Sequence, residues 1–178
     1  MTDADDFESF VRRYEDMVFA TAVRLLGNPS EAEDVAQTVF LRAFERRDAI
    51  VTSPAAGGWL KTVTTNLCLN HLSRYRKRWR LFSELPRMNE ESELEMLEAL
   101  TAGAQRGGDR TDDPASVLQA LASLPAHQRV PLVLFHYDGL SYEAIAARLH
   151  VSLSKLKTDM HRGRQALKRL LEDRYGFR

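Results

Sequence analysis

The sequence predicts an all-α protein made of two small helical domains joined by an acidic linker. Apolar residues recur at helical spacing through most of the 178 residues, and no alternation long enough for a β-strand interrupts them. The formal charge is zero overall but uneven, at +1 over residues 1–80, −6 over residues 81–113 and +5 over residues 114–178. These divisions predict a first domain, a linker and a basic second domain.

The first domain begins with a helix from about residue 4 to residue 26, whose end is marked by Gly27-Asn28-Pro29. Ser30 and Glu33 fit a capping box that opens a second helix, which reaches about Arg46. Its spacing predicts that four residues are buried: Val35, Val39, Phe40 and Ala43.

A loop over Asp48–Gly58 precedes a third helix, which runs from about Gly58 or Trp59 to Arg78. Its end mixes cations with aromatic rings in the run 74–80. Such a mixture suits single-stranded nucleic acid, because cations follow phosphates and rings stack on unpaired bases. An ordinary helix with a buried Trp59 and a solvated basic end remains the alternative.

The linker, residues 81–113, is rich in Glu and contains leucines at 94, 97 and 100 that indicate a short helix. Asp113-Pro114 then fits an N-cap followed by proline at the first helical position. A module of four helices follows, in which Pro131 lies inside a helix over 126–137.

The last part of this module has the pattern of a helix-turn-helix. A helix over 140–149, capped by Ser141, is followed by His150-Val151-Ser152 and a basic helix from about Leu153 to Leu171. Leu156, Met160, Gly163 and Leu167 form the core stripe of that second helix, so residues 158, 161 and 162 point away from the core. A basic helix with such a free face suits the major groove of duplex DNA.

Other classes of protein fit poorly. No nucleophile–base pair, phosphate loop or metal-ligand set is legible, and Cys68 with His71 is better explained as helix core than as a metal site. The acidic N-terminus has no signal-peptide core, and the longest apolar run, 130–135, is too short to cross a bilayer. We therefore expect a cytoplasmic protein without a cofactor and without membrane insertion.

Four motifs together resemble the extracytoplasmic-function sigma factors of bacterial RNA polymerase. The Ala-Glu-Asp…Gln…Phe pattern of that family corresponds to residues 32–40, and its Trp-Leu…Asn pattern to residues 59–66. Its Leu-Ser-Tyr-Glu-Glu-Ile-Ala motif corresponds to residues 140–146, and its Val-Lys-Ser-Arg-Leu-His-Arg-Ala-Arg motif to residues 156–164. The resemblance covers both domains, as a sigma region 2-like domain (1–80) and a region 4-like domain (114–178).

The sequence departs from the family pattern at several positions. Asp159 stands where Arg is common and would place a negative charge near DNA, either orienting Arg162 or accepting from a cytosine amino group. Asn70 replaces a frequent Asp, His150 replaces a common turn glycine, and Ser154-Lys155 replaces Gly-Thr. These departures bear on the promoter sequence rather than on the class of function.

The resemblance implies a non-enzymatic role in promoter-specific transcription initiation. Binding to the clamp helices of the β′ subunit in core polymerase would use Glu33, Asp34, Gln37, Phe40 and Leu41, with a core position of Phe40 as the alternative. Melting and capture of the minus-10 element would use Trp59, Lys61, Asn66, Asn70, Arg74 and Arg76. Reading of the minus-35 element would use Lys155, Lys157, Thr158, His161, Arg162 and Arg164.

Three questions stay open from the sequence. An autonomous helix-turn-helix regulator is the alternative function, although it would need a sensing domain that residues 1–80 do not resemble. The acidic linker would either mimic a nucleic-acid strand in the polymerase channel or serve as a plain tether. Whether an anti-sigma factor is among the partners is also left open.

Overall fold

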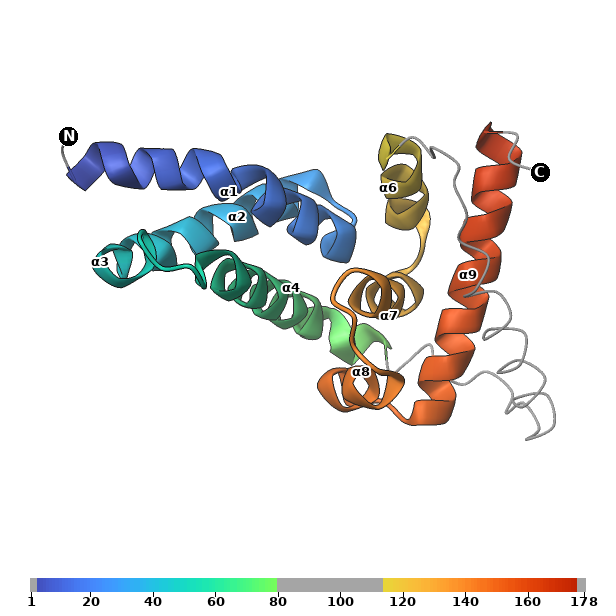
Figure 1. Cartoon of the computed structure of the whole chain (residues 1–178). Coiled ribbons are helices and arrows are strands. Elements are labelled where there is room, and N and C mark those ends of the chain that lie inside the picture. The colour runs from blue at the N-terminus through green and yellow to red at the C-terminus, as the bar shows by residue number, and fades with distance from the viewer. Residues whose placement is uncertain (1–2, 80–113, 176–178) are drawn as a thin grey trace. The chain divides into compact units, whose positions relative to one another are not determined.

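The computed structural model describes residues 3–79 and 114–175, and every regular element in those ranges is a helix (Figure 1). The chain divides into two compact units, Met1–Leu81 and Phe82–Arg178. The predicted all-α class is confirmed. The acidic linker and its short helix near residues 94–100 lie outside the described residues.

Three long helices form the first unit. α1 (Asp3–Leu26) packs against both α2 (Pro29–Phe44) and α4 (Ala56–Trp79), and α2 also packs against α4. A fourth, short helix, α3 (Arg47–Ile50), follows α2. The interior is aliphatic, because Val18, Leu25, Val39 and Leu60 are completely removed from solvent.

The corner between α1 and α2 corrects the predicted start of the second helix. Gly27 ends α1 with φ 69°, and its N–H donates to the carbonyl of Val23 at 2.8 Å, as the glycine predicted. The N-cap of α2, however, is Asn28 rather than Ser30. The Asn28 side chain accepts hydrogen bonds from the N–H groups of Ser30 and Glu31 at 3.0 and 3.4 Å. Proline is well suited to the first helical position, so Asn28-Pro29 begins the helix two residues before the expected capping box.

The segment predicted as a loop over Asp48–Gly58 is partly helical. It contains most of α3, which Ile50 anchors in the interior, and it contains the first turn of α4. Ser53 prepares that turn, since its hydroxyl accepts from the N–H of Ala55 at 3.2 Å and its carbonyl from that of Ala56 at 3.1 Å. The sequence misses α3 because four residues are too few to show a helical period.

The second unit consists of α6 (Pro114–Ser123), α7 (Ala126–His136), α8 (Tyr142–Leu149) and α9 (Leu153–Tyr175). α9 packs against the other three helices, and Leu156 and Met160 are completely buried in that contact. Pro114 begins α6 and Pro131 lies inside α7, as the sequence predicts. Arg129 is buried, and its guanidinium donates to the carbonyl of Leu124 at 2.6 Å, which satisfies a backbone acceptor just beyond α6.

Cys68 lies in the core of the first unit as a free thiol, and burial raises its pKa to about 12. Among the described residues, no group of three or more His, Cys, Asp or Glu side chains could hold a metal ion. None of the helices within 3–79 and 114–175 has the length and apolar character needed to cross a membrane.

Candidate nucleic-acid and partner interfaces

The outer side of α2 carries the first set of predicted site residues. Glu33, Asp34 and Gln37 are all exposed, and Leu41 has 66% of its surface in solvent. Positions 34, 37 and 41 are three, four or seven residues apart, and position 33 precedes position 37 by four, so these residues follow one side of the helix. Phe40 is half-buried, so it contributes to the packing of the unit while keeping part of its ring accessible.

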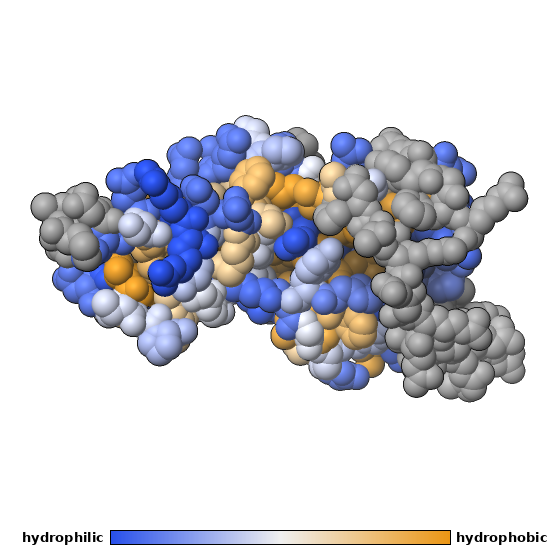
Figure 2. Space-filling model, turned by 45° about the horizontal axis from the view of Figure 1, so that its top comes forward, coloured by the Kyte–Doolittle hydropathy of each residue, from blue (hydrophilic) through white to orange (hydrophobic). Residues whose placement is uncertain are grey.

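The structure adds Phe44 to this side of α2. Phe44 lies four residues after Phe40 and three after Leu41, and 48% of its surface is exposed. Its ring meets that of Phe7 edge-on with 5.1 Å between centroids, and the guanidinium carbon of Arg47 lies 4.9 Å from its centroid. The three-residue spacing between Leu41 and Phe44 in the sequence indicates that both lie on the same side of α2. The face of the first unit that Figure 2 shows is largely hydrophilic and contains separate hydrophobic areas.

A second set of predicted residues lies on α4. Trp59 is half-buried in its first turn, where the guanidinium carbon of Arg46 lies 5.9 Å from the ring centroid. Asn66 and Asn70 are exposed and follow Trp59 by two and three helical turns, so the three residues share one side of α4. This side therefore presents an aromatic ring and two amides, which can stack on a base and hydrogen-bond to its edge.

Of the remaining predicted residues of α4, Lys61 lies on the opposite side of the helix. Lys61 is half-buried and precedes the buried Cys68 by seven residues, which places it on the helix side that faces the core. Arg74 and Arg76 lie within α4, but their side chains are outside the described part of the chain. His71 connects α4 to α2, since its Nε2 lies 3.3 Å from Oε2 of Glu31.

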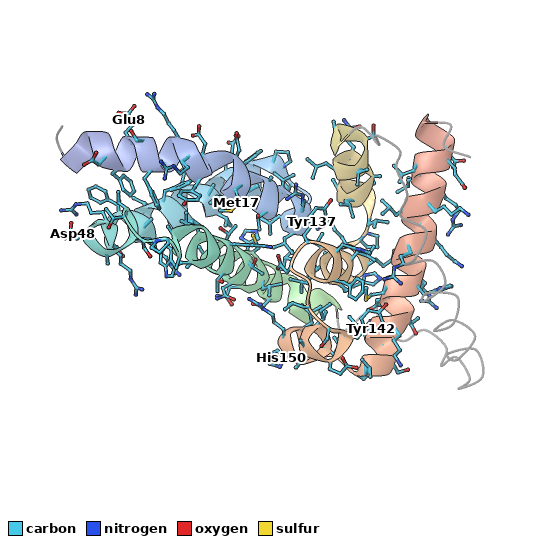
Figure 3. All side chains as sticks on the ribbon, viewed as in Figure 1. Glu8, Met17, Asp48, Tyr137, Tyr142 and His150 are labelled. Carbon is cyan, nitrogen blue, oxygen red and sulfur yellow. The ribbon has the colours of Figure 1, made fainter. Side chains whose placement is uncertain are left out.

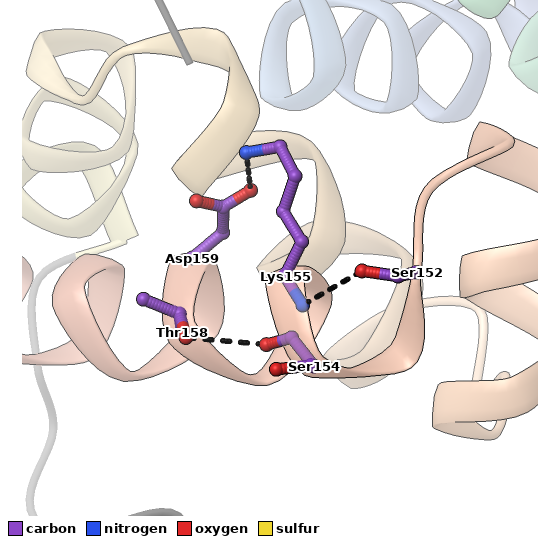
Figure 4. Close-up of polar contacts among 5 residues, drawn as sticks. All are labelled: Ser152, Ser154, Lys155, Thr158 and Asp159. Carbon is purple, nitrogen blue, oxygen red and sulfur yellow. Dashed lines mark hydrogen bonds and ion pairs between the residues drawn. The ribbon is translucent and has the colours of Figure 1, made fainter. Parts of the chain in front are cut away.

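Side chains and backbone cap the start of α8 and both sides of the turn between α8 and α9. The Ser141 hydroxyl accepts from the N–H of Ala144 at 3.2 Å, which confirms the predicted cap of α8. His150, labelled in Figure 3, adopts the left-handed conformation with φ 54° and ψ 45°. This position is where the family pattern has glycine, whose missing Cβ removes the steric cost of that conformation. Ser152 then caps α9 by accepting from the N–H of Lys155 at 3.2 Å (Figure 4).

The side of α9 opposite its core stripe carries the predicted base-reading residues. Thr158, His161 and Arg162 are half-buried, whereas Leu156, Met160 and Gly163 are buried as predicted. The structure adds Ser154 to this side of α9. It is exposed one turn before Thr158, whose hydroxyl donates to the Ser154 carbonyl at 3.1 Å. Two features of the sequence indicate this position. Ser154 precedes Thr158 by four residues, and it lies near the N-terminal end of the helix, whose residues contact base edges in helix-turn-helix proteins.

The predicted phosphate-binding cations of α9 differ in their surroundings. Lys157 is half-buried on the flank of the helix. The guanidinium carbon of Arg164 lies 5.5 Å from the ring centroid of Phe135 on α7. Burial lowers the pKa of the neighbouring His136, and the positive charge of Arg164 lowers it further. Arg164 therefore also holds α9 against α7.

Asp159 does not lie on the side of α9 that carries Thr158 and His161, contrary to the sequence-based expectation. It is buried, with 7% of its surface exposed, and its Oδ2 accepts from Nζ of Lys155 at 2.8 Å. The reason is its spacing, since Asp159 follows the buried Leu156 by three residues and precedes the buried Gly163 by four. Its carboxylate is therefore not placed to accept from a cytosine amino group.

Comparison with known proteins shows the same division into two parts. Residues 10–80 match the family model described as Sigma-70 region 2, and residues 115–167 match Sigma-70, region 4. The chain is 30% identical to the ECF RNA polymerase sigma factor SigW of Bacillus subtilis, over 96% of this chain and 91% of that protein. It is 36% identical to the ECF RNA polymerase sigma factor SigE of Mycolicibacterium smegmatis, over 91% of this chain and 60% of that protein.

A solved structure of the sigma factor RpoE from Bartonella quintana, in complex with the anti-sigma factor NepR, is 25% identical to this chain. It covers 94% of this chain and 97% of its own, with a TM-score of 0.49.

The chain belongs to the extracytoplasmic-function sigma factors of bacterial RNA polymerase. It is an RNA polymerase sigma factor, which acts in promoter-specific transcription initiation. The autonomous helix-turn-helix regulator is not favoured, because the match to region 2 accounts for the first unit as well.

Proposed function

We propose that the two units of this sigma factor divide the work of promoter recognition. The first unit, assigned to residues 1–80, docks on the clamp helices of the β′ subunit and captures the melted minus-10 element. The second unit, assigned to residues 114–178, reads the minus-35 element as duplex. The role is non-enzymatic and belongs in the cytoplasm with the polymerase. The linker over 81–113 connects the two contacts, and an anti-sigma factor is a candidate partner.

The observation that carries this proposal is the arrangement of α9. Its buried stripe of Leu156 and Met160 fixes the helix on the unit, and capped turns hold its N-terminal end. Thr158, His161 and Arg162 then remain for base edges, with Lys157 and Arg164 beside them for phosphates, whereas Lys155 at the helix start is paired with Asp159.

The first unit supports its assigned role with two separate sides. The polymerase would contact the exposed strip of α2, formed by Glu33, Asp34, Gln37, Phe40 and Leu41. The melted strand would contact α4, at Trp59, Asn66 and Asn70, with Lys61, Arg74 and Arg76 as the further cations of that helix. Because the two sides belong to different helices, one unit can hold the polymerase and a displaced strand together.

The proposal is tested by run-off transcription on genomic fragments with purified core polymerase. We expect specific transcripts only when both the chain and core polymerase are present. The chain alone should protect promoter duplex weakly. Strong protection of a specific duplex by the chain alone, with no transcript after polymerase is added, would contradict the proposal.

Replacing Asp34 and Gln37 together by Ala should weaken binding of core polymerase without unfolding the chain. Both side chains are exposed, so their removal leaves the core of the unit unchanged while it deletes two polar contacts of the strip. Affinity is measured by titration with labelled chain, and folding by thermal unfolding. A matched variant, Glu143→Ala with Asp173→Ala, removes two exposed polar side chains from the second unit and should bind polymerase normally. Equal affinities for both double variants would place docking elsewhere.

Replacing Asn66 by Ala should lower open-complex formation on duplex promoters. The amide is exposed on the same side of α4 as Trp59, so its loss removes a hydrogen-bonding group for an unpaired base. Permanganate reactivity of unpaired thymines measures the melted fraction. A pre-melted template should restore only part of the activity, because the base contact itself is still missing. Normal melting by this variant would show that base capture uses other residues.

A further inference from the structure

An ion pair between a buried Asp159 and an exposed Lys155 lies at the start of the recognition helix. The Asp159 side chain is 9% exposed, and its Oδ2 lies 2.8 Å from Nζ of Lys155, one turn earlier on α9. A buried carboxylate is costly unless it is paired with a cation or a hydrogen-bond donor, so this contact is strongly favoured over an unpaired Asp159. The Lys155 side chain is 41% exposed, so Lys155 reaches the surface whereas Asp159 does not.

Figure 4 shows the direction that this contact gives to Lys155. Its side chain extends along the side of α9 that carries Asp159, whereas Ser154 and Thr158 lie on the other side. His127, on α7, belongs to the same neighbourhood. Burial lowers its pKa, the charge of Asp159 acts to raise it, and the charges of Lys155 and Arg162 lower it further. The carboxylate is therefore surrounded by positively charged or ionisable groups from two helices.

We propose that Asp159 is a positioning residue that holds Lys155 away from the DNA backbone, so that Lys155 contributes little to phosphate binding in the native chain. This inference rests on the proposed minus-35 role of α9 and deepens it. The first turn of a recognition helix lies close to DNA, and a free lysine there would attract any sequence equally. By neutralising that lysine, Asp159 leaves discrimination to the side chains that face base edges.

The salt dependence of DNA binding measures this effect directly. Each phosphate neutralised by a cation adds about 0.9 to the slope of log affinity against log salt concentration. In the native chain, Lys155→Met should leave the slope nearly unchanged. Asp159→Asn, which keeps the shape of the side chain but removes its charge, should release Lys155 and steepen the slope by about 0.9. The double variant should return to the native slope.

The experiment uses the full chain and two short duplexes, one from a promoter found by run-off transcription and one with the same composition in scrambled order. Binding is measured by fluorescence anisotropy over a series of salt concentrations for the four members of the cycle. Lys157→Met is the matched control, because it removes a flanking lysine that forms no ion pair with a carboxylate within residues 3–79 and 114–175. It should flatten the slope by about 0.9 on both duplexes.

Two results would overturn the inference. One is that Lys155→Met flattens the slope of log affinity against log salt concentration as much as Lys157→Met does. The other is a gain in Asp159→Asn that persists when Lys155 is also replaced, which would indicate direct repulsion between Asp159 and DNA. If a single variant folds poorly, the double variant, which removes both charges of the pair, is compared with Lys157→Met, and a decrease of the slope as large as in Lys157→Met would again overturn the inference. Promoter-specific transcription by the native chain with core polymerase is measured separately, so failure of the proposed function would be distinguishable from failure of this inference.

Discussion

Replacing Arg162 by Ala is expected to abolish discrimination at one base pair of the minus-35 element. A bidentate contact from a guanidinium to guanine is worth about 1–3 kcal/mol of discrimination against the wrong base. Because about 1.4 kcal/mol corresponds to a factor of ten, the loss should be roughly 5- to 150-fold. The effect should be confined to the one base pair that Arg162 contacts.

The geometry behind this expectation is the position of Arg162 on α9. It lies two residues after the buried Met160, which turns it away from the core, and one turn after Thr158 on the proposed DNA-facing side. Thr158 can meet a thymine methyl group or a base-edge acceptor, so neighbouring base pairs would keep their own readers.

The measurement is binding of the full chain to duplexes in which each position of the minus-35 element is substituted in turn. Lys157→Ala provides the control. It should weaken binding to all duplexes alike, because a phosphate contact carries no sequence information. If Arg162→Ala also weakens every duplex by the same factor and keeps all base preferences, Arg162 is a phosphate contact and the base reading belongs to other residues of α9.

Replacing Gly163 by Val is expected to destabilise the second unit by about 1–3 kcal/mol, the usual cost of adding volume to a packed interior. A Cβ at this position would lie 3.0 Å from Cδ1 of Leu132 and 3.2 Å from both Cβ and the carbonyl oxygen of Gln128. Leu132 is itself buried, and the Gln128 carbonyl belongs to the backbone of α7, so neither can move aside easily.

Gly58 supplies the matched control for that substitution. It also lies in a helix, α4, but a Cβ there would meet nothing within 4 Å. Gly58→Val should therefore leave the stability nearly unchanged, since valine has a somewhat better helix propensity than glycine. Thermal or urea unfolding of both variants gives the comparison. Equal stability of the two would show that α7 and α9 can separate at little cost.

Gly163→Val also tests how the recognition helix is fixed in place. A displaced α9 would carry Thr158, His161 and Arg162 with it, so affinity for the promoter duplex should fall even under conditions where the variant remains folded. Near-native affinity in the folded variant would contradict this, and would indicate that the position of α9 does not depend on the close approach at Gly163.

Much of the molecule follows from local sequence patterns. Helical spacing locates α1, α2, α4 and the four helices of the second unit, and Gly27, Ser141 and Pro114 mark element ends where the structure has them. Such signals are legible because a helix repeats every 3.6 residues and its ends require particular side chains. The class of protein follows in the same way, since the motifs that carry the family resemblance are short and continuous.

The sequence predicts the start of a helix less reliably where two possible capping patterns lie within a few residues of each other. Asn28-Pro29 and Ser30–Glu33 are both plausible helix starts, and the choice of Asn28 follows from hydrogen bonds that only the folded corner contains. α3 carries no readable period, because it is one turn long and is held by the burial of Ile50.

What the sequence determined by itself is therefore the set of helices, their apolar faces and the helix-turn-helix that leads to the family. What only the tertiary structure decided is which polar residues those helices leave accessible. Asp159 and Lys61 are both charged and both lie on the core side of their helices, but packing against other helices removes Asp159 from solvent and leaves Lys61 half-buried. Accessibility depends on contacts between segments distant in the sequence, and helical periodicity shows only on which side of its helix a residue lies.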